Sequence, residues 1–215
     1  ESTTLYSLGD TIVTSLSNEF ICRETKFQLS QQPHFNNYRA IHVNDASAVS
    51  IIDTEFVNCW GKNNIEGHGI CFDRSKPEST LEITSCTFSE CGNYRSVVFS
   101  EASQLHFNHN TIKFEDNYFG STGLSIAKQC HLEVNQCLFS GCRTSKYRYG
   151  LIHRQGGCIE YKPTDDNKDE SLTVTNTVFD SCAGLGSVMY LLPKYTQPVI
   201  NNITVSNQDA QEHCI

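Results

Sequence analysis

Cysteine is the residue type in this chain with the greatest capacity for chemistry. The chain has 11 cysteines among 215 residues, and four of them follow a phenylalanine by three positions. These four pairs are Phe56/Cys59, Phe88/Cys91, Phe139/Cys142 and Phe179/Cys182. No Cys-x-x-Cys occurs and no Cys/His cluster has zinc spacing, so the sequence predicts neither a metal site nor a cofactor.

Two interpretations of these four cysteines are open. As buried free thiols they would pack like small hydrophobic side chains. If consecutive copies lie in neighbouring layers about 4.8 Å apart, Cys59 would instead come within disulfide range of Cys91, and Cys142 within range of Cys182. The high cysteine content favours an oxidising setting, so we expect an extracellular or cell-surface location.

A second group of candidate residues lies in two insertions between the repeats. The segment 143–155 alternates basic and aromatic side chains in a chain whose net charge is −8. Its candidate binding residues are Arg143, Lys146, Tyr147, Arg148, Tyr149 and Arg154, and Trp60 opens the other insertion. Cations beside flat aromatic rings suit a sugar or an acidic peptide. The alternative is that both insertions only cover the side of the fold.

The elements that must position these residues come from one repeated pattern. The stretch Leu81 to Cys91 (LEITSCTFSEC) returns with the same spacing of apolar, small and aromatic residues at 49–59, 132–142 and 172–182, and in a weaker form from Phe20. Apolar residues alternate with others inside each copy, which predicts strands. A strand unit repeated every few tens of residues indicates an all-β parallel β-helix, with about six to seven coils here.

Stacking of the coils would place equivalent residues above one another. The slots of Leu81, Ile83 and Phe88 should each form an inward column with their counterparts in other copies. One unit is ambiguous, because either Ile112 or Phe114 could hold its Phe slot. We expect residues 1–19 to form a cap or an irregular first coil, 20–205 a single β-helix domain, and 206–215 a C-terminal tail.

These repeats resemble those of a known family. The run Gly156 to Ile159 (GGCI), the Phe114-x-x-Asn117 turn and the four Phe-x-x-Cys turns are similar to the GGA[ILV] and FxxN repeats of polymorphic-membrane-protein-type surface proteins of chlamydiae and some protists. The resemblance covers about residues 20–205 and implies a right-handed parallel β-helix of the pectin-lyase-like group. The chain departs from the pattern at four turns, where Cys replaces the motif's Asn. Members of that type resemble adhesins and surface scaffolds.

The pectin-lyase-like fold also includes polysaccharide hydrolases and lyases, which need paired carboxylates or a calcium ion beside a base. Of the hydrolase motifs the chain has only Gly67-His68-Gly69, and Gly69 falls in a small-residue slot of the repeat. Asp53 and His68 are the residues whose replacement would test such an activity. The acidic run from Asp165 to Glu170 is flanked by lysines on one corner, which indicates a solvated turn. The sequence therefore predicts no catalytic residue.

These features predict a non-enzymatic β-helical surface or secreted protein with a structural or adhesive function; the alternative is a polysaccharide hydrolase or lyase. The expected partners are other protein chains, further coils of the same protein, or glycans. Negative charge argues against nucleic acid, and no run of about 18 apolar residues is present to enter a membrane. Because the chain begins at Glu1 and not at Met, we expect a processed product or a segment of a longer protein. Asn202-Ile203-Thr204 is the one glycosylation sequon, relevant if the chain is secreted.

Overall fold

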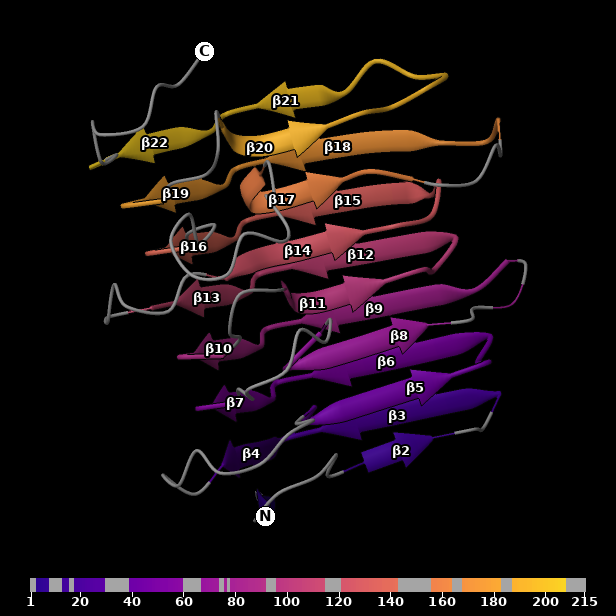
Figure 1. The fold of residues 1–215 in the computed structure, drawn as a ribbon, viewed down its shortest axis with the longest axis vertical. Coiled ribbons are helices and arrows are strands. Elements are labelled where there is room, and N and C mark those ends of the chain that lie inside the picture. Colours follow the sequence, from indigo (N-terminus) through magenta and orange to yellow (C-terminus); the bar gives the residue numbers. More distant parts are fainter. Residues whose placement is uncertain are drawn as a thin grey trace, which may run out of the picture.

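The structure of the chain is a computed structural model. It describes residues 3–7, 13–15, 18–29, 39–59, 67–73, 76, 78–91, 96–114, 121–142, 156–163, 168–182 and 187–207. Every regular element in these ranges is a β-strand. None of them contains a helix long and apolar enough to cross a membrane. Figure 1 shows the strands stacked in layers from the N-terminal to the C-terminal end.

Three parallel sheets run along this stack, and each layer contributes one strand to each sheet. Sheet A contains β1 (Thr3–Ser7), β4 (Thr25–Leu29), β7 (Glu55–Val57), β10 (Thr87–Ser89), β13 (Thr111–Lys113), β16 (Leu138–Ser140), β19 (Val178–Asp180) and β22 (Thr204–Ser206). Sheet B contains β2 (Val13–Ser15), β5 (Ile41–Asn44), β8 (Ile70–Asp73), β11 (Ser96–Ser100), β14 (Thr122–Ile126), β17 (Gly156–Tyr161) and β20 (Ser187–Leu191). Sheet C contains β3 (Glu19–Arg23), β6 (Ala48–Ile52), β9 (Thr80–Thr84), β12 (Gln104–Asn108), β15 (His131–Asn135), β18 (Ser171–Thr175) and β21 (Val199–Asn201).

The chain visits the sheets in the fixed order A, B, C. Its 22 described strands therefore make seven turns of three strands, with β22 as one additional strand. Each strand pairs in parallel with the strand one turn before and one turn after it, as in β9, which lies between β6 and β12. This is a parallel β-helix, and the predicted fold class is confirmed.

Equivalent apolar residues form columns inside the coil. In sheet C, Leu81 lies in register with Val49 on one side and Leu105 on the other, and the column continues through Leu132 to Leu172. All five are at most 2% exposed. The alternation of the sequence puts these residues on one face of each strand, and parallel stacking then aligns them. The predicted columns are confirmed.

The aromatic column in sheet A explains how the ambiguous repeat fits. Phe27, Phe56 and Phe88 stack with ring centroids 5.1 and 4.6 Å apart. The next position is Ile112, which pairs in register with Phe88 and Phe139. At this layer the aromatic stack continues through a residue of sheet C, Phe107, whose ring lies 6.4 Å from Phe88 and 6.1 Å from Phe139. An aromatic side chain on the neighbouring strand thus fills the space that the smaller Ile112 leaves.

A sharp corner separates each sheet C strand from the following sheet A strand. One residue at this corner has a positive φ in every described turn: Glu24, Asp53, Ser85, His109, Gln136, Asn176 and Asn202, with φ between 48° and 56°. The backbone amide of each residue except Asn202, which lies in the last described coil, donates to the next layer, as Asp53 does to the Thr84 carbonyl at 3.1 Å. The ladder of hydrogen bonds therefore continues around the corner, which offsets the cost of the left-handed conformation.

The described stack begins with β1 and β2 and ends with β20, β21 and β22. Residues 1–19 contribute β1 and β2, which pair in register with β4 and β5, so they continue the coil. At the other end, Ile200 and Val205 occupy the inward columns above Val174 and Phe179, yet they are 39% and 50% exposed. The last described coil therefore presents apolar column residues to solvent.

Candidate functional site

The four cysteines of the Phe-x-x-Cys turns are buried free thiols in the structure. In three of the turns, those of Cys59, Cys91 and Cys182, the sulfur lies near two backbone carbonyl oxygens, one of the same layer and one of the layer before. The Cys91 thiol donates to the carbonyls of Ser89 and Phe56 at 3.4 and 3.3 Å. The Cys182 thiol donates equivalently to Asp180 and Phe139, both at 3.3 Å. A side chain with a hydrogen-bond donor suits this position, which gives a physical reason for Cys where the resembling repeats have Asn.

A further cysteine, Cys158, lies beside two of these four, Cys142 and Cys182. The Sγ atoms of Cys142, Cys158 and Cys182 all lie within 4.8 Å of one another, and the three residues are at most 1% exposed. We call this set the three-cysteine cluster. Cys142 and Cys182 come from successive sheet A turns, whereas Cys158 comes from β17 in sheet B. No described third thiol joins Cys59 and Cys91, which we call the cysteine pair.

A break in register lies beside Cys158. Gly156 pairs with Ser187 and Ile159 pairs with Met189, so β17 has one more residue than β20 between these points. This is the one irregular pairing among the described strands. The run that resembles GGA[ILV] thus includes a bulge whose central residue is a cysteine.

The electrostatics of the three thiols are coupled. Burial raises the pKa of Cys142 and of Cys158 well above the ordinary thiol value. Hydrogen bonds from those two thiols instead lower the pKa of Cys182. In the cysteine pair, burial and the neighbouring Cys59 both raise the pKa of Cys91, so that thiol stays protonated.

The three-cysteine cluster lies next in sequence to the insertion that carries the predicted binding residues. Cys142 directly precedes segment 143–155, and Cys158 follows it by three residues. The binding residues predicted there (Arg143, Lys146, Tyr147, Arg148, Tyr149 and Arg154), and Trp60 in the other insertion, lie outside the described residues.

A mixed group of possible ligands occurs on the outer face of sheet B. His42 Nε2 lies 3.1 Å from Asp73 Oδ1, and the Cys71 thiol lies 3.9 Å from Asp73 Oδ2. Their three ligand atoms lie within 4.8 Å of one another. Because β5 and β8 pair with His42 opposite Cys71, the residues meet through the ladder alone. Nitrogen, sulfur and oxygen ligands together suit a divalent transition metal.

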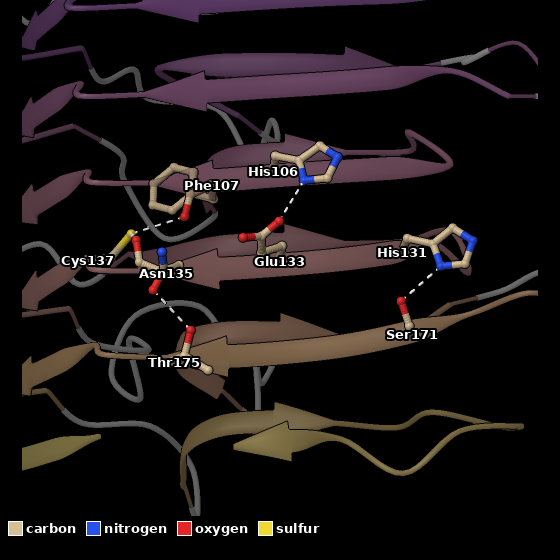
Figure 2. Close-up of polar contacts among 8 residues, drawn as sticks. All are labelled: His106, Phe107, His131, Glu133, Asn135, Cys137, Ser171 and Thr175. Atoms are coloured by element: carbon tan, nitrogen blue, oxygen red, sulfur yellow. Dashed lines mark hydrogen bonds and ion pairs between the residues drawn. The ribbon is translucent and has the colours of Figure 1, made fainter. Parts of the chain in front are cut away.

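The outer face of sheet C carries polar residues in direct register. Figure 2 shows His106 and Glu133 joined across β12 and β15, with Nδ1 and Oε2 3.0 Å apart. One layer further, His131 Nδ1 lies 2.9 Å from Ser171 Oγ, and Thr175 donates to Asn135 Oδ1 at 3.0 Å. The same view shows the Cys137 thiol donating to the Phe107 carbonyl at 3.1 Å.

Two carboxylates flank His106 on this face. Glu82 is the register partner of His106 on the preceding strand and Glu133 on the following one. Two layers separate the two glutamates, a distance of about 10 Å between their Cα atoms. Sequence analysis missed this arrangement, although both glutamates hold the same outward slot of the repeat, in LEIT and LEVN.

The residues chosen to test an enzymatic function do not meet in the described structure. Asp53 is the positive-φ residue of a corner between sheets C and A, whereas His68 lies just before β8 in sheet B and is fully buried. Asp165 and Asp166 lie outside the described residues.

Glu170 belongs to the interior edge of the fold and not to a solvated acidic turn. It is 8% exposed and accepts hydrogen bonds from the Tyr161 hydroxyl at 2.9 Å and from the Tyr195 and Thr196 amides at 2.5 and 3.2 Å. Burial raises its pKa, but these hydrogen bonds outweigh burial and lower it. The acidic run was expected to be solvated; Glu170 departs from that because its side chain satisfies buried donors.

The glycosylation sequon lies on an exposed corner. Asn202 is exposed, and its Nδ2 donates to Asn176 Oδ1 of the preceding layer at 2.6 Å. Asn176 in turn donates to Asn135 Oδ1 at 2.9 Å. The sequon side chain is thus part of a short asparagine ladder on the surface.

Comparisons with protein-family models, with curated proteins and with solved structures found no match. The arrangement of this chain's own residues is therefore what supports a function.

Proposed function

We propose that this chain is a non-enzymatic structural segment of a surface or secreted β-helical protein that acts in adhesion or assembly. The supporting observation is the last described coil, where Ile200 and Val205 hold inward column positions but remain 39% and 50% exposed. Beside them, β20, β21 and β22 each have a partner on one side only in the described part of the chain. Apolar columns and free backbone edges together favour pairing with further strands.

The expected occupant of this end is a β-helical coil of a second protein chain. A flat apolar ligand would cover Ile200 and Val205 but would leave the backbone donors and acceptors of three strands without partners. A parallel strand in register satisfies both at once. Because such a contact joins two different surfaces, it propagates as a line of subunits unless something blocks it. Assembly into elongated surface structures follows from this geometry.

Sedimentation velocity of the chain over a range of concentrations tests the assembly. We expect concentration-dependent association that disappears in the double variant Ile200→Lys/Val205→Lys. Ile21→Lys is the matched control, since Ile21 is 63% exposed but lies near the other end of the described stack. A wild-type chain that stays monomeric at high concentration, or a double variant that associates normally, would contradict the proposed assembly.

The adhesive part of the proposal concerns the insertion 143–155. Binding of the chain to immobilised glycans and to acidic peptides should be lost when Arg148 and Tyr149 are both replaced by Ala, because the charge and the ring supply the contact. Replacement of Lys26 by Ala is the control: it removes an exposed cation in an ion pair with Glu55 at 3.0 Å, far along the chain. Unchanged binding in the loop variant would rule out this segment as the contact.

One observation favours the second candidate, a polysaccharide hydrolase. Glu82 and Glu133 are the register partners of His106 on the preceding and the following strand, so two carboxylates lie on one face of sheet C, and paired carboxylates are what glycoside hydrolysis requires. Release of reducing sugar from pectin-like polymers, lost in Glu133→Gln and unaffected by Asp169→Asn, would establish this activity. Absence of sugar release from any acidic or neutral polysaccharide would leave the structural function.

A further inference from the structure

The three-cysteine cluster has the composition of a metal site. Its three sulfurs lie within 4.8 Å of one another. Three thiolates bound to one ion at about 2.3 Å have their sulfurs about 4 Å apart. Small side-chain rotations therefore suffice to bring all three sulfurs onto one ion, and no backbone segment has to move.

Comparison with the other layers shows that the third sulfur is a local addition. The residue just before the register-matched positions Ile70, Val98, Leu124 and Ile159 is Gly69, Val97, Gly123 and Cys158, respectively. Only the last of these brings a functional group, and it does so at the layer where β17 bulges. Packing alone needs no sulfur at this position, because two other layers fill it with glycine.

The surroundings of the cluster limit the kind of ion. Cys142 and Cys158 are fully buried and Cys182 is 1% exposed. No histidine or carboxylate of the described residues joins the group, so the described part of the chain offers three sulfur ligands. Zinc favours a tetrahedral set. Thiolate ligands select soft ions, and Cu(I) is the soft physiological ion that accepts three of them.

We propose that Cys142, Cys158 and Cys182 bind one Cu(I) ion through three sulfur ligands. Each thiol loses its proton to solvent, and the resulting thiolate forms one Cu–S bond; no electron is transferred. The positive charge of the ion offsets the cost of burying the thiolates. The ion would fix Cys142 and Cys158, and with them both ends of the insertion between these residues.

The test is an anaerobic Cu(I) competition on fully reduced protein against a coloured Cu(I) chelator. Because the sulfurs are buried, the protein is refolded in the presence of the ion so that access does not limit loading. Wild type should retain one equivalent of Cu(I), and X-ray absorption should show three sulfur neighbours. Cys158→Ala should bind more than about 100-fold more weakly, since losing a ligand should exceed the about 10–100-fold cost of losing a supporting hydrogen bond.

Matched variants separate this site from the other thiols. Cys91→Ala disrupts the cysteine pair and should leave the tightly held equivalent unchanged. Cys158→Gly places at this position the residue found in two other layers, so it removes the sulfur with the smallest risk to folding, which circular dichroism checks. Retention equal to wild type in both Cys158 variants would overturn the proposal. A two-sulfur spectrum, or a Cys142–Cys182 disulfide that resists reduction in the folded protein, would do so as well.

Discussion

The cysteine pair and the three-cysteine cluster are built from the same turn but have different chemistry. In both, a Phe-x-x-Cys turn points a thiol at the carbonyl of the preceding layer, as Cys91 does to Phe56 and Cys182 to Phe139. The difference is one residue of sheet B. Where the first region has Gly69, the second has Cys158 on a bulge. A repeat that supplies a regular wall can therefore acquire a reactive group by changing one position.

Two layers have glycine at this position, and the space around each glycine shows why a side chain is excluded there. A Cβ on Gly69 would lie 3.0 Å from the ring of Phe88, and one on Gly123 would lie 2.8 Å from the ring of Phe139. At the equivalent position Val97 fits, because the aromatic slot of the following sheet A strand holds Ile112 and not a phenylalanine. Ring size in sheet A thus limits side-chain size in sheet B.

The largest expected effect tests what the two regions share. Phe88→Ala and Phe139→Ala should each lower the free energy of unfolding by about 3–5 kcal/mol, because both rings are fully buried and stacked in one column. Urea denaturation followed by circular dichroism measures the loss, with Thr87→Ala as the control at an exposed position of the same strand. A loss below about 1 kcal/mol in one variant only would show that the two regions are not equivalent walls.

The next effect belongs to the second region alone. Glu170→Gln should cost about 1.5–3 kcal/mol, because it removes the charge from hydrogen bonds to Tyr161 and the Tyr195 amide. The pKa of Glu170 is lowered in the folded chain. The stabilisation is therefore complete above the unfolded carboxyl pKa and is lost as the pH falls through the folded value. Thermal melts across acidic pH should show the variant and wild type converging.

Glu82→Gln is the control for this prediction, since Glu82 is exposed in the region of the cysteine pair. It should change the free energy of unfolding by less than about 0.5 kcal/mol at any pH. If wild type and Glu170→Gln instead kept a constant difference down to low pH, hydrogen bonding to an ionised Glu170 would be wrong.

A third variant makes the region of the cysteine pair more like that of the three-cysteine cluster. Gly69→Cys puts a sulfur at the position equivalent to Cys158 in the region of the cysteine pair, without the bulge that lies beside Cys158. Its Cβ would meet Phe88 at 3.0 Å, so we expect a loss of about 1–3 kcal/mol from overpacking. Denaturation should report this loss, and Cu(I) competition should show no second tight site. Tight binding at unchanged stability would mean that the bulge is not required.

Sequence periodicity predicted the strands that form the wall of the coil, because these strands are marked by a local alternation of apolar and polar residues. Val49, Leu81 and Leu132 could be assigned to one column since strands of period two leave a single face for apolar residues. The Phe slot of one unit was ambiguous because either Ile112 or Phe114 could fill it. The compensating ring of Phe107 comes from another sheet, and no spacing rule within one copy reveals it.

The three-cysteine cluster could not be predicted from the sequence, because its residues come from three separate segments that meet only when the coils stack. Cys142 and Cys158 are separated by an insertion of variable length, which hides their distance. Metal-site patterns look for ligands close in sequence, whereas stacking here joins residues up to 40 positions apart, such as Cys142 and Cys182. The available sequence signal was Cys158, which stands where equivalent layers have Gly69 and Gly123.

The smallest effect tests whether a thiol in the wall has any role beyond packing. Cys86 holds a slot that other layers fill with Thr54 or Thr177. The Cys86 thiol donates to the Thr84 carbonyl at 3.3 Å, and the hydroxyl of Thr177 donates to the matching Thr175 carbonyl at 2.7 Å. Burial raises the pKa of Cys86 to about 12, so no charge is lost on replacement.

Cys86→Thr should therefore cost less than about 1.5 kcal/mol, as expected for a replacement of similar size that keeps the hydrogen bond. Cys86→Val, which has the same shape as Thr but no donor, is the matched control and should cost more. Denaturation midpoints of both variants give the comparison. If Thr were as damaging as Val, hydrogen bonding would not explain the slot, and the thiols of the wall would need a function of their own, as we infer only for the three-cysteine cluster.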